Sequence, residues 1–350
     1  MQVAAGARPI SEVGEFGLIA AVSNLLAASR VRSAGMLLGP GDDAALWQPR
    51  AGRVVCVSTD MLVEGVHFRN DWSDATAIGH RALAVNLSDM AAMGARPRTA
   101  IVALALRGTE TERWVYDFYR GALALAHKWH VRIIGGDMSL SPTAAVASVT
   151  VNGELRNSEA VLRRDFARPG DVIAVTGPLG LAAAGVRALQ LGRTRIDGAP
   201  AMLAAHRMPQ PRILQGMLLV RAGVRCGMDI SDGLFGDLPK ILEASGVSAE
   251  VRADRLPIPL AIRWNFPDWF DLATRGGEDF ELLFTAPRDV VEHAAGLFRR
   301  LRLPAPVVIG SIMARKGDES QLTLRRFDLT RQDVPFGAYD HFSAKPGTHG

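Results

Sequence analysis

The stretch RVVCVSTDMLVEGVHF, residues 53–68, contains the pattern from which the fold can be predicted. Residues 53–59 form a β-branched run that favours a strand, and this strand leads to Asp60. Segments 12–30 and 76–94, on either side, carry apolar residues at helical spacing. Beyond them we expect a helix at 114–129 and strands at 131–134 and 144–151. The first half of the chain is therefore predicted to be mixed α/β.

A polar, charge-rich stretch at 156–170 separates this half from the next. A strand at 171–176, a glycine turn and a helix through Leu191 then restart the pattern, and strand and helix are expected to alternate to about Ser311. The helix after Asp232 is predicted to end at Gly246, because glycine is a common helix C-cap. We therefore expect two domains with a disordered tail, at 1–155, 156–342 and 343–350.

Composition narrows the class of protein. Hydrophobic residues make up 48% and charged residues 22%, which excludes intrinsic disorder for most of the chain. Apolar stretches fall far short of the ~20 residues that cross a bilayer, so we expect a soluble protein. The two cysteines cannot form a disulfide framework, and Glu12 and Glu15 stand where a signal peptide would be apolar, which favours the cytoplasm. The net charge of +4 comes from scattered arginines, a pattern that does not favour nucleic-acid binding.

Aspartates recur at the ends of apolar segments and beside glycine. They are Asp42 and Asp43 in GPGDDAAL, Asp60 in VSTD, Asp89 in NLSD, Asp137 in IIGGD, and Asp229 and Asp232 in DISDG. Each motif alone is more readily explained as a turn or an N-cap. Together they favour a site for a hard divalent cation such as magnesium, because gathered carboxylates repel one another unless cations or protons neutralise them.

Two weaker features are substrate-contact candidates. The segment TGPLG, residues 176–180, could hold a phosphate at a helix N-terminus, but it lacks the lysine of a Walker-type loop. His67 follows the predicted strand and lies close to Asp60 in sequence. A lone histidine in a loop is more often a residue with ordinary local partners than a ligand, and no histidine and cysteine spacing indicates zinc.

Eight blocks occur in a characteristic order. They are GEFGLI, GDDAAL, VSTDMLVEGVHF, HRALAVNLSDMAAMGARP, IIGGD, DISDGL, GGEDFELLFT and GAYDHF. From Glu12 to about Phe342 they resemble thiamine-monophosphate kinase, in the ATP-binding superfamily that includes aminoimidazole ribonucleotide synthetase and selenophosphate synthetase. VEGVHF and GGEDFELLFT favour the kinase branch.

The resemblance implies a two-domain α/β (α+β) fold and a set of site residues. The N-terminal domain would bind ATP and magnesium. Its mixed sheet would pair with that of a second copy in a homodimer, because the strands at 53–59 and 144–151 would otherwise leave exposed edges. Implied magnesium ligands are Asp43, Ser58, Thr59, Asp60, Asp89, Asp137, Asp229 and Asp232. Implied contacts are Gly136, Arg164 and Ser231 for ATP, and His67, Glu278 and Phe336 for thiamine monophosphate.

The implied reaction is phosphorylation of thiamine monophosphate by ATP, in line and with several magnesium ions. The acceptor is already a phosphate monoester with about two negative charges, so no catalytic base is expected. Two alternatives stay open: another reaction of the superfamily, ring-closing or selenophosphate-forming, or a nucleotide-binding protein without catalysis. The chain departs from the family pattern at Pro40, Met61, Met138, Leu140 and Phe336, and the two changes after Asp137 affect the region of nucleotide contact.

Overall fold

The computed structural model of the protein describes residues 8–29, 35–38, 44–315, 317 and 321–335. Of the expected site residues, Asp43 and Phe336 lie outside this part of the chain, as does the tail at 343–350. The described part of the chain forms two compact units: the first lies within residues 1–90 and 96–156, and the second lies within residues 91–95 and 157–348. Among the described residues, no helix is long and apolar enough to cross a membrane.

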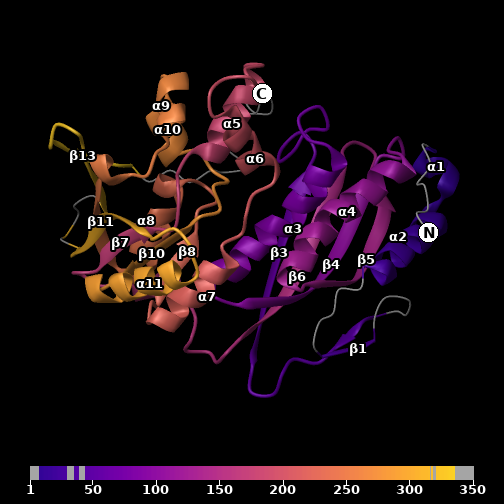
Figure 1. Cartoon of the computed structure of the whole chain (residues 1–350), viewed down its shortest axis with the longest axis horizontal. Helices are drawn as coiled ribbons and strands as arrows, with labels where there is room; N and C mark the ends of the chain where they lie inside the picture. Colours follow the sequence, from indigo (N-terminus) through magenta and orange to yellow (C-terminus); the bar gives the residue numbers. More distant parts are fainter. Residues whose placement is uncertain (1–7, 30–34, 39–43, 316, 318–320, 336–350) are drawn as a thin grey trace. The chain divides into compact units, whose positions relative to one another are not determined.

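The first unit is built on a four-stranded mixed sheet with the order β3-β6-β4-β5 (Figure 1). Its strands are β3 (Val54–Val63), β4 (Arg96–Leu106), β5 (Arg132–Leu140) and β6 (Val146–Leu155). Its helices and short strands are α1 (Ile10–Val13), α2 (Glu15–Ala28), α3 (Ala75–Ala92), α4 (Glu112–Trp129), β1 (Met36–Leu38) and β2 (Leu46–Trp47). β6 pairs antiparallel with both β3 and β4, while β4 and β5 are parallel.

One face of this sheet is buried and the other is open. Alternate residues of β4 and β6, such as Val102 and Val149, are almost fully buried together with Leu87 of α3 and Phe118 of α4. α3 and α4 approach each other at two glycines. A Cβ on Gly121 would lie 1.8 Å from the Thr76 carbonyl oxygen, so only glycine fits there.

On the opposite face of the same sheet, large apolar side chains reach the solvent. Val57 of β3 is 59% exposed and Met61 is 54% exposed, and Ile101 of β4 is 40% exposed. The strand register places Thr59, Thr150 and Ile101 in one row across this face. We call this surface the open face.

The structure confirms the predicted helices of the first unit and corrects the strands. β4 was not predicted, although it lies between β6 and β5. β6 is paired on both sides, so the expectation of an exposed edge at 144–151 was wrong, whereas β3 is an edge of the described sheet. Because β3 and β5 are longer than predicted, Asp60 and Asp137 lie inside strands rather than at their ends.

The second unit has a seven-stranded sheet with the order β13-β12-β9-β11-β7-β10-β8. Its strands are β7 (Val172–Val175), β8 (Cys226–Asp229), β9 (Val247–Arg252), β10 (Leu282–Ala286), β11 (Val307–Ala314), β12 (Leu322–Arg325) and β13 (Arg331–Asp333). Its helices are α5 (Leu181–Gln190), α6 (Ala199–Arg207), α7 (Ile213–Ala222), α8 (Leu234–Ser245), α9 (Leu260–Asn265), α10 (Trp269–Thr274) and α11 (Arg288–Arg300), with short 3₁₀ turns η1 (Arg164–Phe166) and η2 (Ala253–Arg255).

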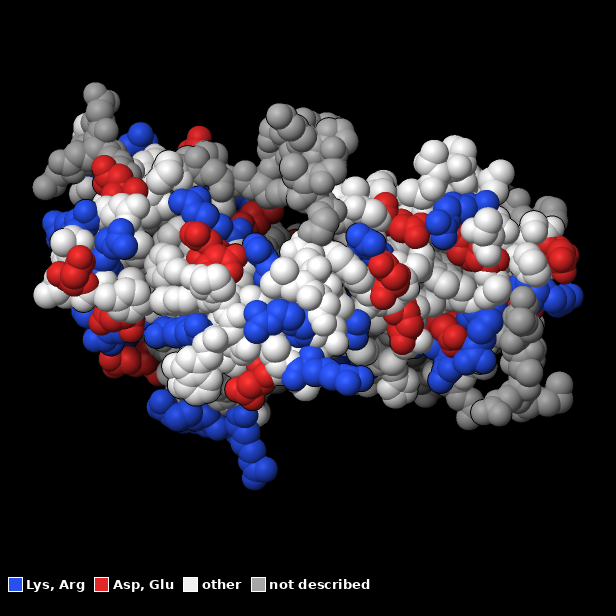
Figure 2. Space-filling model, turned by 90° about the horizontal axis from the view of Figure 1, so that it is seen from above, with Lys and Arg blue, Asp and Glu red and all other residues white. Residues whose placement is uncertain are grey.

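Strand and helix do not alternate strictly in this unit, contrary to expectation. Three helices, α5 to α7, follow β7, and both α9 and α10 precede β10. The predicted end of α8 is confirmed, because Gly246 caps it in the left-handed conformation with φ of 66°. Figure 2 shows acidic and basic side chains interspersed on the viewed face, as the scattered arginines of the sequence suggested.

Candidate functional site

Ser58 and Asp89 are two implied magnesium ligands that the structure brings into contact. Ser58 lies on β3, on the side that faces α3, and its hydroxyl donates a hydrogen bond to Asp89 Oδ2. Asp89 lies near the C-terminal end of α3 and is half-buried. Burial, and then the negative charge of Asp89, raise the pKa of the Cys56 thiol on the same strand. A hydroxyl beside a carboxylate provides the hard oxygen donors that magnesium prefers.

The neighbouring implied ligands are exposed at the surface of the same unit. Thr59 Oγ1 lies 3.0 Å from Thr150 Oγ1, on the open face. Asp60 is exposed on β3 and Asp137 is exposed on β5. Gly136 has a structural reason to be glycine, because a Cβ there would lie 2.0 Å from the Val102 carbonyl oxygen.

In the described ranges, no group of three or more His, Cys, Asp or Glu side chains is placed to hold a metal ion together. Asp43, one of the implied ligands, is not among these residues. Ser58 and Asp89 are implied ligands that are in direct contact. The oxygen donors of Ser58, Asp89, Asp60 and Asp137 suit magnesium by chemical type.

His67 is held in the turn that follows β3. The backbone N–H of Val63 donates a hydrogen bond to His67 Nδ1 over 3.0 Å. Because Nδ1 accepts this bond, the proton of the neutral ring is on Nε2, which makes Nε2 a donor. His67 is half-buried, so its ring is fixed by the turn yet not enclosed.

In the second unit, the DISDG segment wraps around a buried aspartate that sequence reasoning missed. Asp237 Oδ2 accepts hydrogen bonds from the backbone N–H groups of Ser231 and Asp232, at 2.9 and 2.8 Å. Lys240 Nζ lies 2.7 Å from Asp237 Oδ1 and 2.6 Å from Asp232 Oδ2. Burial raises the pKa of Asp237 despite these partners. Asp232, an implied magnesium ligand, is therefore ion-paired with Lys240, while Asp229 is buried at the end of β8.

The GGEDFEL segment lies against DISDG. The backbone N–H of Glu278 donates to the Ser231 carbonyl over 2.8 Å, which brings two implied contact residues together. Glu278 Oε2 lies 3.3 Å from Nδ1 of His206, a buried residue of α6 that was not foreseen. Arg164 has an exposed side chain in η1, and its carbonyl accepts a hydrogen bond from Ser245.

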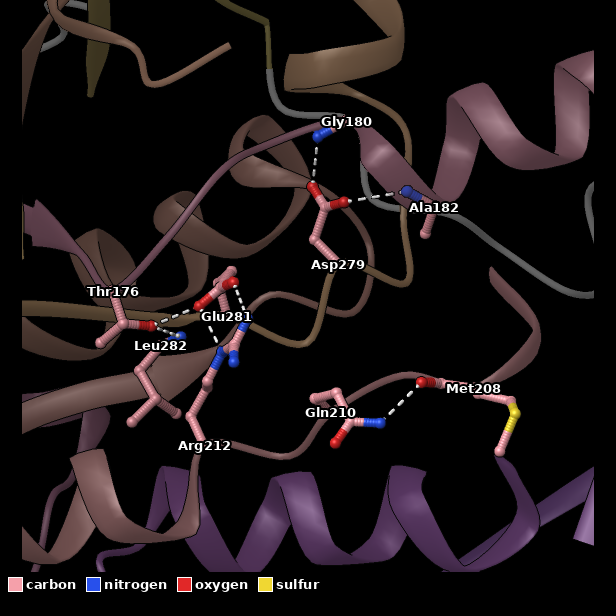
Figure 3. Close-up of polar contacts among 9 residues, drawn as sticks. All are labelled: Thr176, Gly180, Ala182, Met208, Gln210, Arg212, Asp279, Glu281 and Leu282. Carbon is pink, nitrogen blue, oxygen red and sulfur yellow. Dashed lines mark hydrogen bonds and ion pairs between the residues drawn. The ribbon is translucent and has the colours of Figure 1, made fainter. Parts of the chain in front are cut away.

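Asp279 and Glu281 were not singled out from the sequence, although both stand in the quoted GGEDFELLFT block. Figure 3 shows their carboxylates turned toward the segment that joins β7 to α5. Asp279 accepts hydrogen bonds from the backbone N–H groups of Gly180 and Ala182, at 2.6 and 3.3 Å. Burial raises the pKa of Asp279 to about 7. The Gly180 amide of the TGPLG turn is thus engaged by Asp279, and the Leu179 amide donates to the Pro257 carbonyl, which argues against a phosphate cradle at that turn.

Two domain families match the chain. "AIR synthase related protein, N-terminal domain" matches residues 41–155, and "AIR synthase related protein, C-terminal domain" matches residues 168–323. The fold and the matches define an ATP-binding protein of the AIR synthase-related class.

Within that class, two relatives are thiamine-monophosphate kinases. Thiamine-monophosphate kinase from Bacillus subtilis (strain 168) is 37% identical over 312 residues, covering 87% of this chain and 93% of that protein. The enzyme from Salmonella typhimurium (strain LT2) is 39% identical over 341 residues, covering 94% and 98%. The chain belongs to the thiamine-monophosphate kinase family.

Two solved structures are also similar to the chain. The crystal structure of thiamine-monophosphate kinase from Stenotrophomonas maltophilia K279a superposes with a TM-score of 0.79 at 39% identity, covering 87% of this chain and 95% of that one. The complex described as AaThiL with AMPPCP and TMP superposes with a TM-score of 0.73 at 27% identity, covering 96% and 99%.

Proposed function

We propose that the protein phosphorylates thiamine monophosphate with ATP, giving thiamine diphosphate and ADP. The observation that carries this proposal is the similarity to thiamine-monophosphate kinases along nearly the whole chain, 39% identity over 94% of its length. It is supported by a related structure, similar over 96% of this chain, that holds an ATP analogue together with TMP.

In the first unit, magnesium would be held by the oxygen donors of Ser58 and Asp89, with Asp43, Thr59, Asp60 and Asp137 as further ligands. In the second unit, Asp229 and Asp232 would be ligands. Bound there, several ions would neutralise the phosphates of both substrates, which otherwise repel each other. The protein residues bind and orient the two substrates in line, and the acceptor phosphate needs no catalytic base.

Substrate recognition would be shared between a donor and an acceptor side chain. His67 presents an Nε2–H donor, because its Nδ1 accepts from Val63. Glu278 presents a carboxylate that suits the cationic thiazolium ring and the aminopyrimidine of thiamine monophosphate. Ser231, Arg164 and Gly136 would contact ATP, and Phe336 would stack on an aromatic ring of thiamine monophosphate.

We also propose a homodimer formed through the open face. This face exposes the apolar side chains of Val57, Met61 and Ile101, with Thr59 and Thr150 between them. Exposed apolar surface commonly marks an interaction site. A second copy packed on this face would remove them from water. Two free thiols, Cys56 and Cys226, are in keeping with a cytoplasmic location.

The alternative of selenophosphate synthesis is disfavoured by the cysteines. Burial raises the pKa of both the Cys56 and the Cys226 thiol, whereas a reactive thiol needs a lowered pKa.

The decisive experiment is incubation with ATP, magnesium and thiamine monophosphate, followed by identification of the products. We expect equal amounts of thiamine diphosphate and ADP, and no phosphorylated protein. A phosphorylated enzyme intermediate, or turnover with a non-thiamine acceptor alone, would contradict the proposal. ATP binding without turnover would favour the nucleotide-binding alternative.

A further inference from the structure

Three acidic side chains within four residues reach three different partners. They belong to the acidic loop, residues 276–281, which precedes β10 in the second unit. Glu278 contacts His206, Asp279 contacts the start of α5, and Glu281 contacts Arg212. The loop is therefore anchored on several sides at once.

The loop has an unusual backbone. Glu278 has φ of 73° and Phe280 has φ of 50°, although neither is glycine. Residues with a Cβ rarely adopt this region, and they persist in it only where the surroundings determine the conformation. The position of the Glu278 carboxylate consequently depends on what holds the loop.

Part of the restraint comes from the backbone of the DISDG segment. Phe280 N–H donates to the Ile230 carbonyl over 2.9 Å, and Ile230 N–H donates to the Glu281 carbonyl over 2.8 Å. With the bond from Glu278 N–H to Ser231, these contacts tie one side of the loop to β8 and its continuation.

Asp279 supplies the opposite restraint. Its two carboxylate oxygens accept from Gly180 N–H at 2.6 Å and from Ala182 N–H at 3.3 Å, so one side chain joins the loop to the first turn of α5 (Figure 3). The two oxygens satisfy amides at the helix start that have no partner within the helix.

Glu281, at the end of the acidic loop, contacts the same segment between β7 and α5. Its side chain is 2% exposed, and it accepts from Thr176 Oγ1 at 2.7 Å and from Arg212 Nε at 2.8 Å. Thr176 Oγ1 in turn accepts from Leu282 N–H at 2.8 Å. A Cβ on Gly177 would lie 2.3 Å from Glu281 Oε1, so the carboxylate packs directly on the glycine turn.

We infer that Asp279 and Glu281 are positioning residues for Glu278: they clamp the acidic loop to the segment between β7 and α5 and thereby fix where the Glu278 carboxylate meets the thiamine ring system. This inference rests on the proposed function and on the role of Glu278 in it. Neither residue needs to touch the substrate.

The test compares Asp279→Asn and Glu281→Gln with a matched control, Glu292→Gln, which removes one charge from an exposed position of α11. Asparagine can accept only one of the two amide hydrogen bonds, so the clamp loosens without a change in size. We expect Asp279→Asn to raise the KM for thiamine monophosphate about tenfold and to leave the KM for ATP within about twofold. The control should match the parent.

A double-mutant cycle separates positioning from general stability. In a Glu278→Gln background, adding Asp279→Asn should change the KM for thiamine monophosphate by less than about twofold, because the carboxylate that it positions is already gone. Equal losses for both substrates, or full additivity with Glu278→Gln, would overturn the inference. If Glu281→Gln fails to fold, the Asp279 cycle decides alone. If the parent and the control do not turn over thiamine monophosphate, the proposed function fails and the positioning role falls with it.

Discussion

The substitution Asp89→Asn separates a metal ligand from a purely structural carboxylate. Asp89 lies near the end of α3 and accepts a hydrogen bond from Ser58, and asparagine keeps an oxygen for that bond while removing one charge. Exchanging a charge-assisted hydrogen bond for a neutral one costs about 1 kcal/mol. We therefore expect the Tm of the metal-free protein to change by less than about 3 °C.

The rise in Tm on addition of magnesium and ATP should be much larger for the parent than for Asp89→Asn. A ligand that binds only the folded state, present at about 100 times its Kd, adds about 2.7 kcal/mol of stability. The parent should show a clear rise in Tm with magnesium and ATP, and Asp89→Asn should lose most of it. Turnover of thiamine monophosphate should fall by at least about 100-fold. Thermal unfolding followed by fluorescence, with and without the ligands, measures the first effect and product formation measures the second.

A control lies at the other end of the same helix. Asp74 Oδ1 accepts the Ala77 N–H at 2.7 Å, so Asp74→Ala removes an N-cap and costs about 1 kcal/mol. This variant should melt lower than the parent in both conditions and keep the full rise with magnesium and ATP. If Asp89→Asn behaves like Asp74→Ala, Asp89 is structural and the argument for a metal ligand is refuted.

Three further outcomes are expected. Gly121→Ala should lower the free energy of unfolding by about 3 kcal/mol, because its Cβ would lie 1.8 Å from the Thr76 carbonyl oxygen. A urea titration that shows a negligible loss of stability would refute the close crossing of α3 and α4. Val57→Glu should convert the proposed dimer to a monomer in light scattering, since this side chain is 59% exposed on the open face, and an unchanged mass would place the interface elsewhere. The pKa of Asp279 is raised to about 7 by burial, with Glu281 adding repulsion, so its stability contribution is full in acid and is lost as pH rises through about 7. Asp279→Asn should flatten that fall of Tm between pH ~4 and ~7, and an unchanged slope would contradict the raised pKa.

Local pattern was sufficient for the helices of the first unit and for the end of α8. α4 follows its amphipathic spacing to Trp129, and α8 ends at Gly246 because a left-handed glycine closes it. These features depend on residues a few positions apart, and this is why sequence alone predicts them. The ordered blocks were sufficient for the family in the same way, since they are strings of neighbouring residues.

Strand pairing could not be predicted in the same way. β4 is buried between β6 and β5, so its run of alanine, valine and leucine lacks the alternation that would distinguish it from another buried segment. The length of β5, and hence the place of Asp137 inside a strand, depends on its pairing with β4. Pairing is a long-range property and leaves little local trace.

The sequence by itself determined the two-domain α/β class and the family, and it predicted the acids and the histidine of a phosphoryl-transfer site. The tertiary structure alone decided which of those acids meet which partners. Asp89 meets Ser58, Asp232 is paired with Lys240, and Asp279 caps α5 from a loop 97 residues away along the chain. The reason is physical: a carboxylate takes its role from the charges, donors and burial around it, and those are supplied by segments that only folding brings together.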